Sequence, residues 1–140
     1  MKRIAIAFTL LTSVIIAAPD DDRVAARRTA LDLAGAWSND GFKLRDGHWS
    51  GTFKTGEAKL VQVNLYAGNQ YWFTLGTTEN AKKVAVSVFD ENGKPVVFQL
   101  HQDGARAAAG FAPLISGSYI VKIEELEGQP SAFALIYSYK

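Results

Sequence analysis

Hydrophobic and polar residues alternate in short runs over most of this chain, and turn-forming residues separate the runs. The clearest case is the segment 65–75, in which one strand, a turn at Gly68-Asn69 and a second strand follow one another. In the second strand Tyr71, Phe73 and Leu75 share one face, because successive side chains of a strand point to opposite sides. Such alternation, with a turn every 8–12 residues or so, predicts an antiparallel β-sandwich.

The same pattern recurs further along the chain and predicts about eight strands. We expect them at residues 49–54, 60–66, 71–75, 84–89, 95–100, 107–112, 119–124 and 133–139. Asn92-Gly93 is a strong signal for a hairpin, since both central positions of such a turn tolerate positive φ. The expected core comes from two facing sheets. Its predicted members are Tyr71, Phe73, Tyr119, Val121, Ile123, Phe133 and Leu135.

Residues 18–38 precede the strands and show a different pattern. Apolar residues recur there near helical spacing, at Val24, Ala30, Leu31, Ala34 and Trp37. Three acids at residues 20–22 suit the positive end of a helix. We therefore predict a helix over residues 21–36 that packs on the sandwich through Leu31, Ala34 and Trp37. A frayed tail on the surface is the alternative.

Residues 1–17 have the layout of a secretory signal peptide, with Lys2 and Arg3 before an apolar run and small residues after it. We expect cleavage after Ala17, because cleavage after Ala18 would leave Pro19 just past the broken bond. An uncleaved anchor is the alternative, but the apolar run is shorter than the roughly 18 residues of a spanning helix. The expected division is 1–17 signal peptide, 18–38 helix and 39–140 β-sandwich, with the product in the periplasm or secreted.

Charge and cysteine content exclude several classes of function. Without the signal peptide, the 15 basic residues fall to 13 against 14 acidic ones, a net charge of −1. The remaining sequence has no stripe of basic residues that would indicate binding to nucleic acid. It also has no basic amphipathic helix that would indicate binding to a membrane surface. The chain has no cysteine, which excludes disulfides, thiolate metal sites and a thiol nucleophile. The fold must rest on its core, which a 48% hydrophobic composition can supply.

Three motifs in this order resemble a known bacterial family. They are Leu-x-Ala-Gly-x-x-Tyr-x-Phe-x-Leu at residues 65–75, Val-Phe-Asp-x-x-Gly at 88–93 and Phe-x-Pro-x-x-x-Gly-x-Tyr-x-Val-x-Ile at 111–123. In this respect residues 49–139 resemble the pre-peptidase C-terminal domain. The resemblance implies an antiparallel β-sandwich of jelly-roll type, which exported peptidases and other enzymes carry as an appended module. Some members bind calcium, but the acidic cluster of those sites is missing here.

Residues with reactive side chains are few and scattered. Residues 90–93, Asp-Glu-Asn-Gly, superficially resemble a calcium loop, yet the bidentate acid that such a loop needs further on is absent. His48 and His101 are the only histidines, and no Gly-x-Ser-x-Gly motif surrounds a serine. We expect a protein that is not an enzyme and holds no cofactor or metal. A small secreted hydrolase or enzyme accessory subunit, with a site around His48, is the alternative.

Aromatic side chains give the sharpest hint of a ligand. If Tyr71 and Phe73 face the core, Trp72 faces outward, and Tyr66 is out of phase with the inward residues of its own strand. We expect the N-terminal helix to cover this patch. In the alternative it is an open platform that stacks on sugar rings or on a protein, formed by Trp72, Tyr66, Trp49 and Trp37.

The sequence thus predicts an exported β-sandwich module that binds or scaffolds a ligand outside the cytoplasm. The expected partners are a polysaccharide or another exported protein, with no nucleic acid and no membrane once the signal peptide is removed. A structural envelope protein without a ligand is a further alternative. The oligomeric state does not follow from the sequence.

Overall fold

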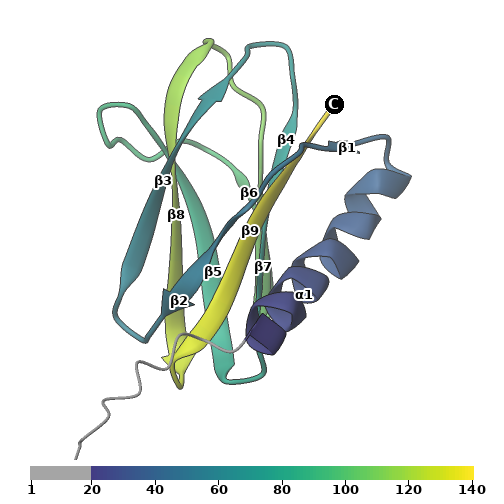
Figure 1. The fold of residues 1–140 in the computed structure, drawn as a ribbon. Coiled ribbons are helices and arrows are strands. Elements are labelled where there is room, and N and C mark those ends of the chain that lie inside the picture. The colour runs from purple at the N-terminus through teal and green to yellow at the C-terminus, as the bar shows by residue number, and fades with distance from the viewer. Residues whose placement is uncertain (1–19) are drawn as a thin grey trace, which may run out of the picture.

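The computed structural model describes residues 20–140 as one helix followed by nine strands (Figure 1). The predicted signal peptide lies outside the described residues. The elements are α1 (Asp20–Asn39), β1 (Lys43–Leu44), β2 (Trp49–Phe53), β3 (Ala58–Leu65), β4 (Tyr71–Thr77), β5 (Ala81–Asp90), β6 (Gln99–Asp103), β7 (Arg106–Phe111), β8 (Gly117–Gly128) and β9 (Ser131–Tyr139). The helix in residues 20–140 is not long and apolar enough to cross a membrane.

The strands form two sheets, which we call sheet A and sheet B. Sheet A has six strands in the order β1-β9-β4-β7-β6, with β2 pairing β9 beside β1, and sheet B has three in the order β3-β8-β5. The pairings between the strands are antiparallel. The predicted fold class, an antiparallel β-sandwich with an N-terminal helix, is confirmed.

The core lies between the two sheets, where the alternating apolar residues meet. All seven residues predicted for it belong to one buried cluster, and Phe73, Val121, Ile123 and Leu135 are fully inaccessible to solvent. Burial of each large apolar side chain stabilises the fold by roughly 1.5–3 kcal/mol. The alternation read from the sequence therefore assigns the inward faces of β4, β8 and β9 correctly.

The segment 95–104 differs from the prediction. Residues 95–100 do not form a hairpin strand with β5, because only one isolated bridge, Phe89 to Pro95, joins them. Pro95 has no N–H to donate, and the chain then crosses to sheet A. There residues 99–103 form the edge strand β6 and pair β7, although the predicted strand ends at residue 100. No residue of β6 is fully buried, so it lacks the alternation that marks the other strands.

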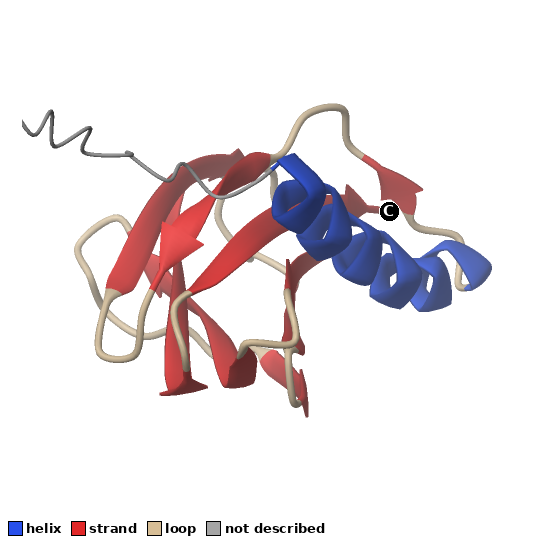
Figure 2. Cartoon of the chain, turned by 60° about the horizontal axis from the view of Figure 1, so that its bottom comes forward, coloured by secondary structure: helices blue, strands red, loops and turns tan. Residues whose placement is uncertain are grey.

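Helix α1 lies across the outer face of sheet A (Figures 1 and 2). The outward residues of the sheet beneath it are small, among them Gly76, Ala132 and Ala134, so the helix approaches closely. A Cβ on Gly76 would lie 2.3 Å from the backbone nitrogen of Ala30, which leaves glycine as the residue that fits. The alternative of a frayed tail is therefore wrong for residues 20–39.

The helix packs through a stripe that differs in part from the predicted one. Ala30, Ala34 and Trp37 form a cluster with Ile136 of β9, while Ala26 contacts Ala132 and Ala134. Leu31, predicted to pack, is 37% exposed. The spacing 26, 30, 34 repeats every four residues along one side of the helix, and residue 31 lies about 100° away from residue 30.

Candidate ligand-binding site

The two tryptophans expected on the outer face of sheet A lie there and cover each other. The Trp37 and Trp72 rings stack with centroids 3.8 Å apart and an angle of 2° between their planes. The indole N–H of Trp37 donates a hydrogen bond to the Thr74 hydroxyl, at 3.1 Å. Trp72 also lies over Gly110, where a Cβ would come within 2.9 Å of its ring. This stack therefore fastens α1 to the sheet, and Trp72 also lines a depression of about 300 Å³ together with Phe42, Phe98 and Phe111.

Trp49 does not join that stack, so the structure does not bring the four aromatic residues together. In the register of β2 with β9, Trp49 lies opposite Leu135. Paired residues of an antiparallel ladder point to the same face, and Leu135 faces the core. Trp49 accordingly packs at the edge of the core, with its ring 5.9 Å from that of Tyr137. The alternative that placed Trp49 in an outward patch is therefore wrong.

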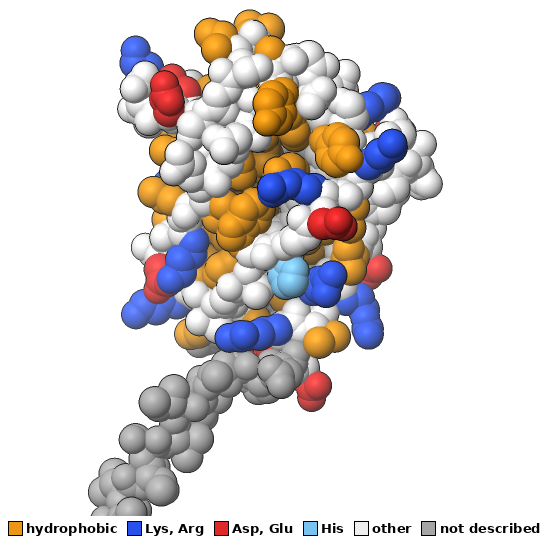
Figure 3. All heavy atoms as spheres, turned by 45° about the horizontal axis from the view of Figure 1, so that its top comes forward, with side chains coloured by type: hydrophobic (Ala, Val, Ile, Leu, Met, Phe, Trp, Pro, Cys, Tyr) orange, Lys and Arg blue, Asp and Glu red, His pale blue; other side chains and the backbone are white. Residues whose placement is uncertain are grey.

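Tyr66 lies elsewhere, at the end of the sandwich where β3 turns into β4, and its side chain is 64% exposed. It lines a depression of about 290 Å³ that we call the tyrosine pocket. The residues that line this pocket are Arg45, Asn64, Tyr66, Asn69, Tyr71, Tyr137 and Tyr139. The face of the molecule turned forward in Figure 3 carries hydrophobic side chains in broad patches, with basic ones between them.

Strand pairing and the β3–β4 turn hold the tyrosine pocket together. Tyr71 and Tyr139 are direct partners in the register of β4 and β9, so their side chains point the same way. The Tyr71 hydroxyl accepts hydrogen bonds from the backbone N–H of Tyr66, at 2.9 Å, and from the Asn69 amide, at 3.2 Å. Gly68 turns the chain with a φ of 91°, a conformation that favours glycine. The pocket is therefore built before any ligand arrives.

A cation borders the pocket. The guanidinium carbon of Arg45 lies 4.8 Å from the centroid of the Tyr137 ring, within the range of a cation–π contact. The backbone N–H of Arg45 donates to the Tyr137 carbonyl, at 3.0 Å, and fixes the start of this side chain. Burial raises the pKa of the Tyr137 hydroxyl above its usual range, and the Arg45 guanidinium opposes that rise. The arginine therefore acts electrostatically at the tyrosine ring.

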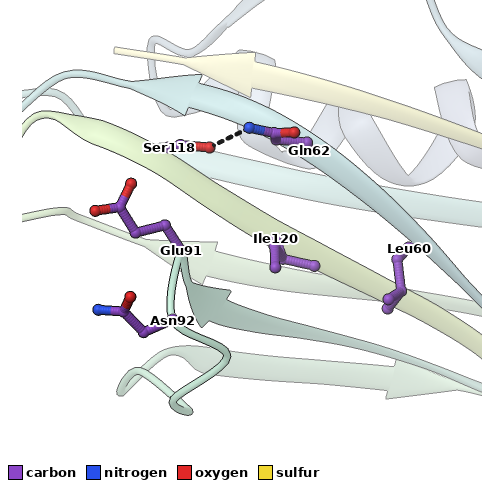
Figure 4. A pocket seen from close by; sticks show the side chains of 6 residues that line it. All are labelled: Leu60, Gln62, Glu91, Asn92, Ser118 and Ile120. Carbon is purple, nitrogen blue, oxygen red and sulfur yellow. Dashed lines mark hydrogen bonds between the residues drawn. The ribbon is translucent and has the colours of Figure 1, made fainter.

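A second depression lies on the outer face of sheet B, with a volume of about 640 Å³. Leu60 and Ile120 form its apolar floor, with Glu91 and Asn92 of the turn after β5 at its rim (Figure 4). The amide of Gln62 donates to the Ser118 hydroxyl across the floor, at 2.6 Å. This bond uses one donor of the Gln62 amide, and no aromatic ring lines this depression. This depression therefore lacks the aromatic rings that the tyrosine pocket offers to a ligand.

The residues considered for metal binding and catalysis lie apart. Asp90 Oδ1 accepts hydrogen bonds from the backbone N–H groups of Asn92 and Lys94, at 2.9 Å each, as expected of a turn. His48 lies in the exposed connection between β1 and β2, and the ring of His101 packs edge-on to Trp37 at 6.0 Å. Within residues 20–140, no three His, Cys, Asp or Glu side chains are grouped so that they could hold a metal ion.

Glu125 is a buried carboxyl group at the other end of the sandwich. It is 1% exposed, and within the described part of the chain neither of its oxygens has a hydrogen-bond partner. Burial raises its pKa, and the nearby Thr55 hydroxyl opposes the rise. Within residues 20–140, no other titratable group contributes to this shift in pKa.

Comparison with known proteins supports the fold. No protein-family model matches the chain, and no curated protein matches it. Among solved structures, Aeromonas hydrophila PliG, a periplasmic inhibitor of g-type lysozyme, is 16% identical with a TM-score of 0.51, over 67% of this chain and 85% of PliG. A CBM4 carbohydrate-binding module is 15% identical with a TM-score of 0.43, over 76% of this chain and 83% of that module.

At 16% identity, the likeness to PliG establishes the fold alone. The resemblance to the pre-peptidase C-terminal domain stays a prediction, since neither PliG nor the CBM4 module is such a domain. Any ligand must therefore be argued from the residues of this chain.

Most residues of the tyrosine pocket were not identified from the sequence. Of its seven members only Tyr66 was a predicted ligand-binding residue. The signal that could have pointed to it is Tyr137-Ser138-Tyr139, where alternation places two tyrosines on one face at the end of a strand. Arg45 and Asn64 carry no such signal, because only the pairing of distant strands brings them to the same place.

Proposed function

We propose that this protein is an exported, non-catalytic β-sandwich module that binds a carbohydrate through the tyrosine pocket. One observation carries the proposal. The residues Tyr66 and Tyr139 are 64% and 38% exposed, in a depression that also presents amide, hydroxyl and guanidinium groups. The other aromatic pair, Trp37 and Trp72, is used within the fold.

The chemistry of the tyrosine pocket suits a sugar. A pyranose has an apolar face of C–H groups, which packs on an aromatic ring, and hydroxyl groups at its edge, which need donors and acceptors. Asn64 and Asn69 each offer both kinds of group, and the Tyr137 and Tyr139 hydroxyls add more. The volume of about 290 Å³ is near the lower limit of small-molecule sites, which fits one or two residues of a longer polysaccharide.

A glycan array probed with the purified protein tests this function, with the Tyr66→Ala variant beside it. We expect the wild-type protein to bind a defined subset of saccharides and the variant to lose that signal while its melting temperature stays unchanged. Absence of binding across the array, or a signal unaffected by Tyr66→Ala, would contradict the proposal.

Export is tested separately. Expression of the full chain followed by cell fractionation and N-terminal sequencing should recover a product outside the cytoplasm that begins at Ala18. A product that stays cytoplasmic with Met1 or Lys2 at its start would contradict export, without bearing on what the pocket binds.

A protein partner is the second candidate, favoured by a different observation. In the loop between β7 and β8, Leu114 is 95% and Ile115 75% exposed, although the loop is well held. The Tyr119 hydroxyl donates to the Ile115 carbonyl, at 2.6 Å, and the Ser116 hydroxyl accepts from the N–H of Ala67, at 2.8 Å. Two exposed aliphatic side chains on a fixed loop suit burial in a partner. Binding to an exported protein that is lost in Leu114→Ser would favour this candidate.

A further inference from the structure

We propose that the tyrosine pocket selects acidic saccharides, with the Arg45 guanidinium holding the carboxylate or sulfate group of the sugar. The inference rests on the proposed function and names the class of carbohydrate that the same pocket takes. Three observations support it: the charges that line the pocket, the way Arg45 is held, and the groups that surround it.

The pocket carries a cation without a matching anion of its own. Its lining consists of one arginine, two asparagines and four tyrosines, with no Asp or Glu among them. In the described part of the chain the ion pairs are Lys59 with Glu57, Arg106 with Asp103 and Lys122 with Glu124, and Arg45 is in none of them. Asp46 follows Arg45 in the sequence but does not line the pocket. A ligand that enters therefore meets a positive charge.

Arg45 is also held where a ligand would meet it. Its backbone is fixed by the hydrogen bond to the Tyr137 carbonyl, and its guanidinium lies 4.8 Å from the Tyr137 ring centroid. The Tyr71 hydroxyl, on the same pocket, is fixed by two donors. Because these groups are positioned in advance, a ligand loses less conformational freedom on binding than it would at mobile side chains.

An arginine side chain binds a carboxylate better than it binds a neutral hydroxyl group. Its planar guanidinium can donate two parallel hydrogen bonds to the two oxygens of a carboxylate, and hydrogen bonds to charged groups are stronger than neutral ones. A uronic or sialic acid also keeps the apolar ring face that an aromatic side chain needs. One acidic sugar can thus pack on Tyr66 or Tyr139 while its anionic group reaches Arg45.

A paired glycan array tests the inference. It carries oligosaccharides with uronic acid, sialic acid or sulfate groups, each beside a counterpart whose carboxylate is methyl-esterified or whose sulfate is absent. The protein is applied as wild type, Arg45→Gln, Arg45→Lys and Arg106→Gln. Arg106 is a half-buried arginine paired with Asp103, and its strand position lies opposite Gly76, at the other end of β4 from Tyr71, so its variant controls for loss of one positive charge away from the pocket. Thermal melts of each variant verify folding.

We expect wild type to bind acidic members more tightly than their neutral counterparts, with Arg45→Gln reducing that affinity by about tenfold or more. Arg45→Lys should retain part of the preference, and Arg106→Gln all of it. The preference should also weaken as salt is raised from low to high ionic strength.

Equal binding of acidic and neutral members, or an acidic preference that survives Arg45→Gln, would overturn the inference. If neutral saccharides bind and Tyr66→Ala removes that binding, the proposed function stands while the class of sugar named here is wrong. If no glycan binds at all, both are wrong.

Discussion

Two aromatic regions of this molecule differ in what covers them. The Trp37–Trp72 stack lies on the outer face of sheet A, where helix α1 supplies one ring and the sheet the other. The tyrosine pocket lies at the end of the sandwich, where Tyr66 and Tyr139 remain open to solvent beside Arg45. The first region completes the fold and the second is free to meet a ligand. An aromatic residue on the outward face of a strand is therefore a candidate for ligand binding only if no other part of the same chain covers it.

The largest effect on stability is expected from a substitution that disrupts the packing of α1 on sheet A. In Gly76→Ala the new Cβ would lie 2.3 Å from the backbone nitrogen of Ala30 and 2.4 Å from the carbonyl of Ala26, so α1 must shift. We expect a loss of about 3–5 kcal/mol in the free energy of unfolding, measured by urea denaturation. Gly35→Ala is the matched control, since its Cβ meets nothing within 4 Å, and it should stabilise by up to about 1 kcal/mol. Equal effects of the two changes would contradict the close packing of the helix.

A smaller loss of stability is expected when the Trp37–Trp72 stack is removed. Trp72→Ala removes a half-buried ring that contacts Trp37 and Gly110, and we expect the free energy of unfolding to fall by about 2–3 kcal/mol. Saccharide binding should remain, because Trp72 does not line the tyrosine pocket. Thermal melts together with a binding titration check both parts. A stable variant that has lost binding would show that the covered region is the site after all.

Tyr66→Ala should weaken saccharide binding while leaving the stability of the fold unchanged. The side chain is 64% exposed, and the hydrogen bond at this position comes from its backbone N–H, which the variant keeps. We expect the free energy of unfolding to stay within about 0.5 kcal/mol of wild type, by the same urea measurement. A loss as large as that of Trp72→Ala would indicate that Tyr66 is a structural residue and would remove the contrast between the two regions.

The smallest effect concerns the electrostatics of the pocket. Since the Arg45 guanidinium favours the ionised form of the Tyr137 hydroxyl, it holds the pKa below the value that burial alone would give. Removing that charge in Arg45→Gln should therefore raise the pKa of Tyr137 further. A titration of the tyrosine ring signals by NMR measures this in the absence of any ligand. An unchanged or lowered pKa would contradict the placement of Arg45 over the ring.

The sequence predicts the fold better than it predicts the site, for a physical reason. Alternation identifies the inward residues of β4, β8 and β9, because each such strand has one buried face. It misses β6, an edge strand without a fully buried residue, and β1, which has two residues. The tyrosine pocket joins side chains from the connection after β1, from β3, β4 and the turn between them, and from β9. Whether these side chains become neighbours depends on the register of distant strands. Local pattern carries no information about that register.

One measurement compares the two regions directly. The affinity of the tightest-binding saccharide is determined by calorimetry for wild type, Tyr66→Ala and Trp72→Ala, at a temperature at which all three are folded. We predict that Tyr66→Ala weakens binding by about tenfold or more, and that Trp72→Ala leaves it within about twofold. Loss of binding in Trp72→Ala with full affinity in Tyr66→Ala would contradict the assignment of the tyrosine pocket as the site.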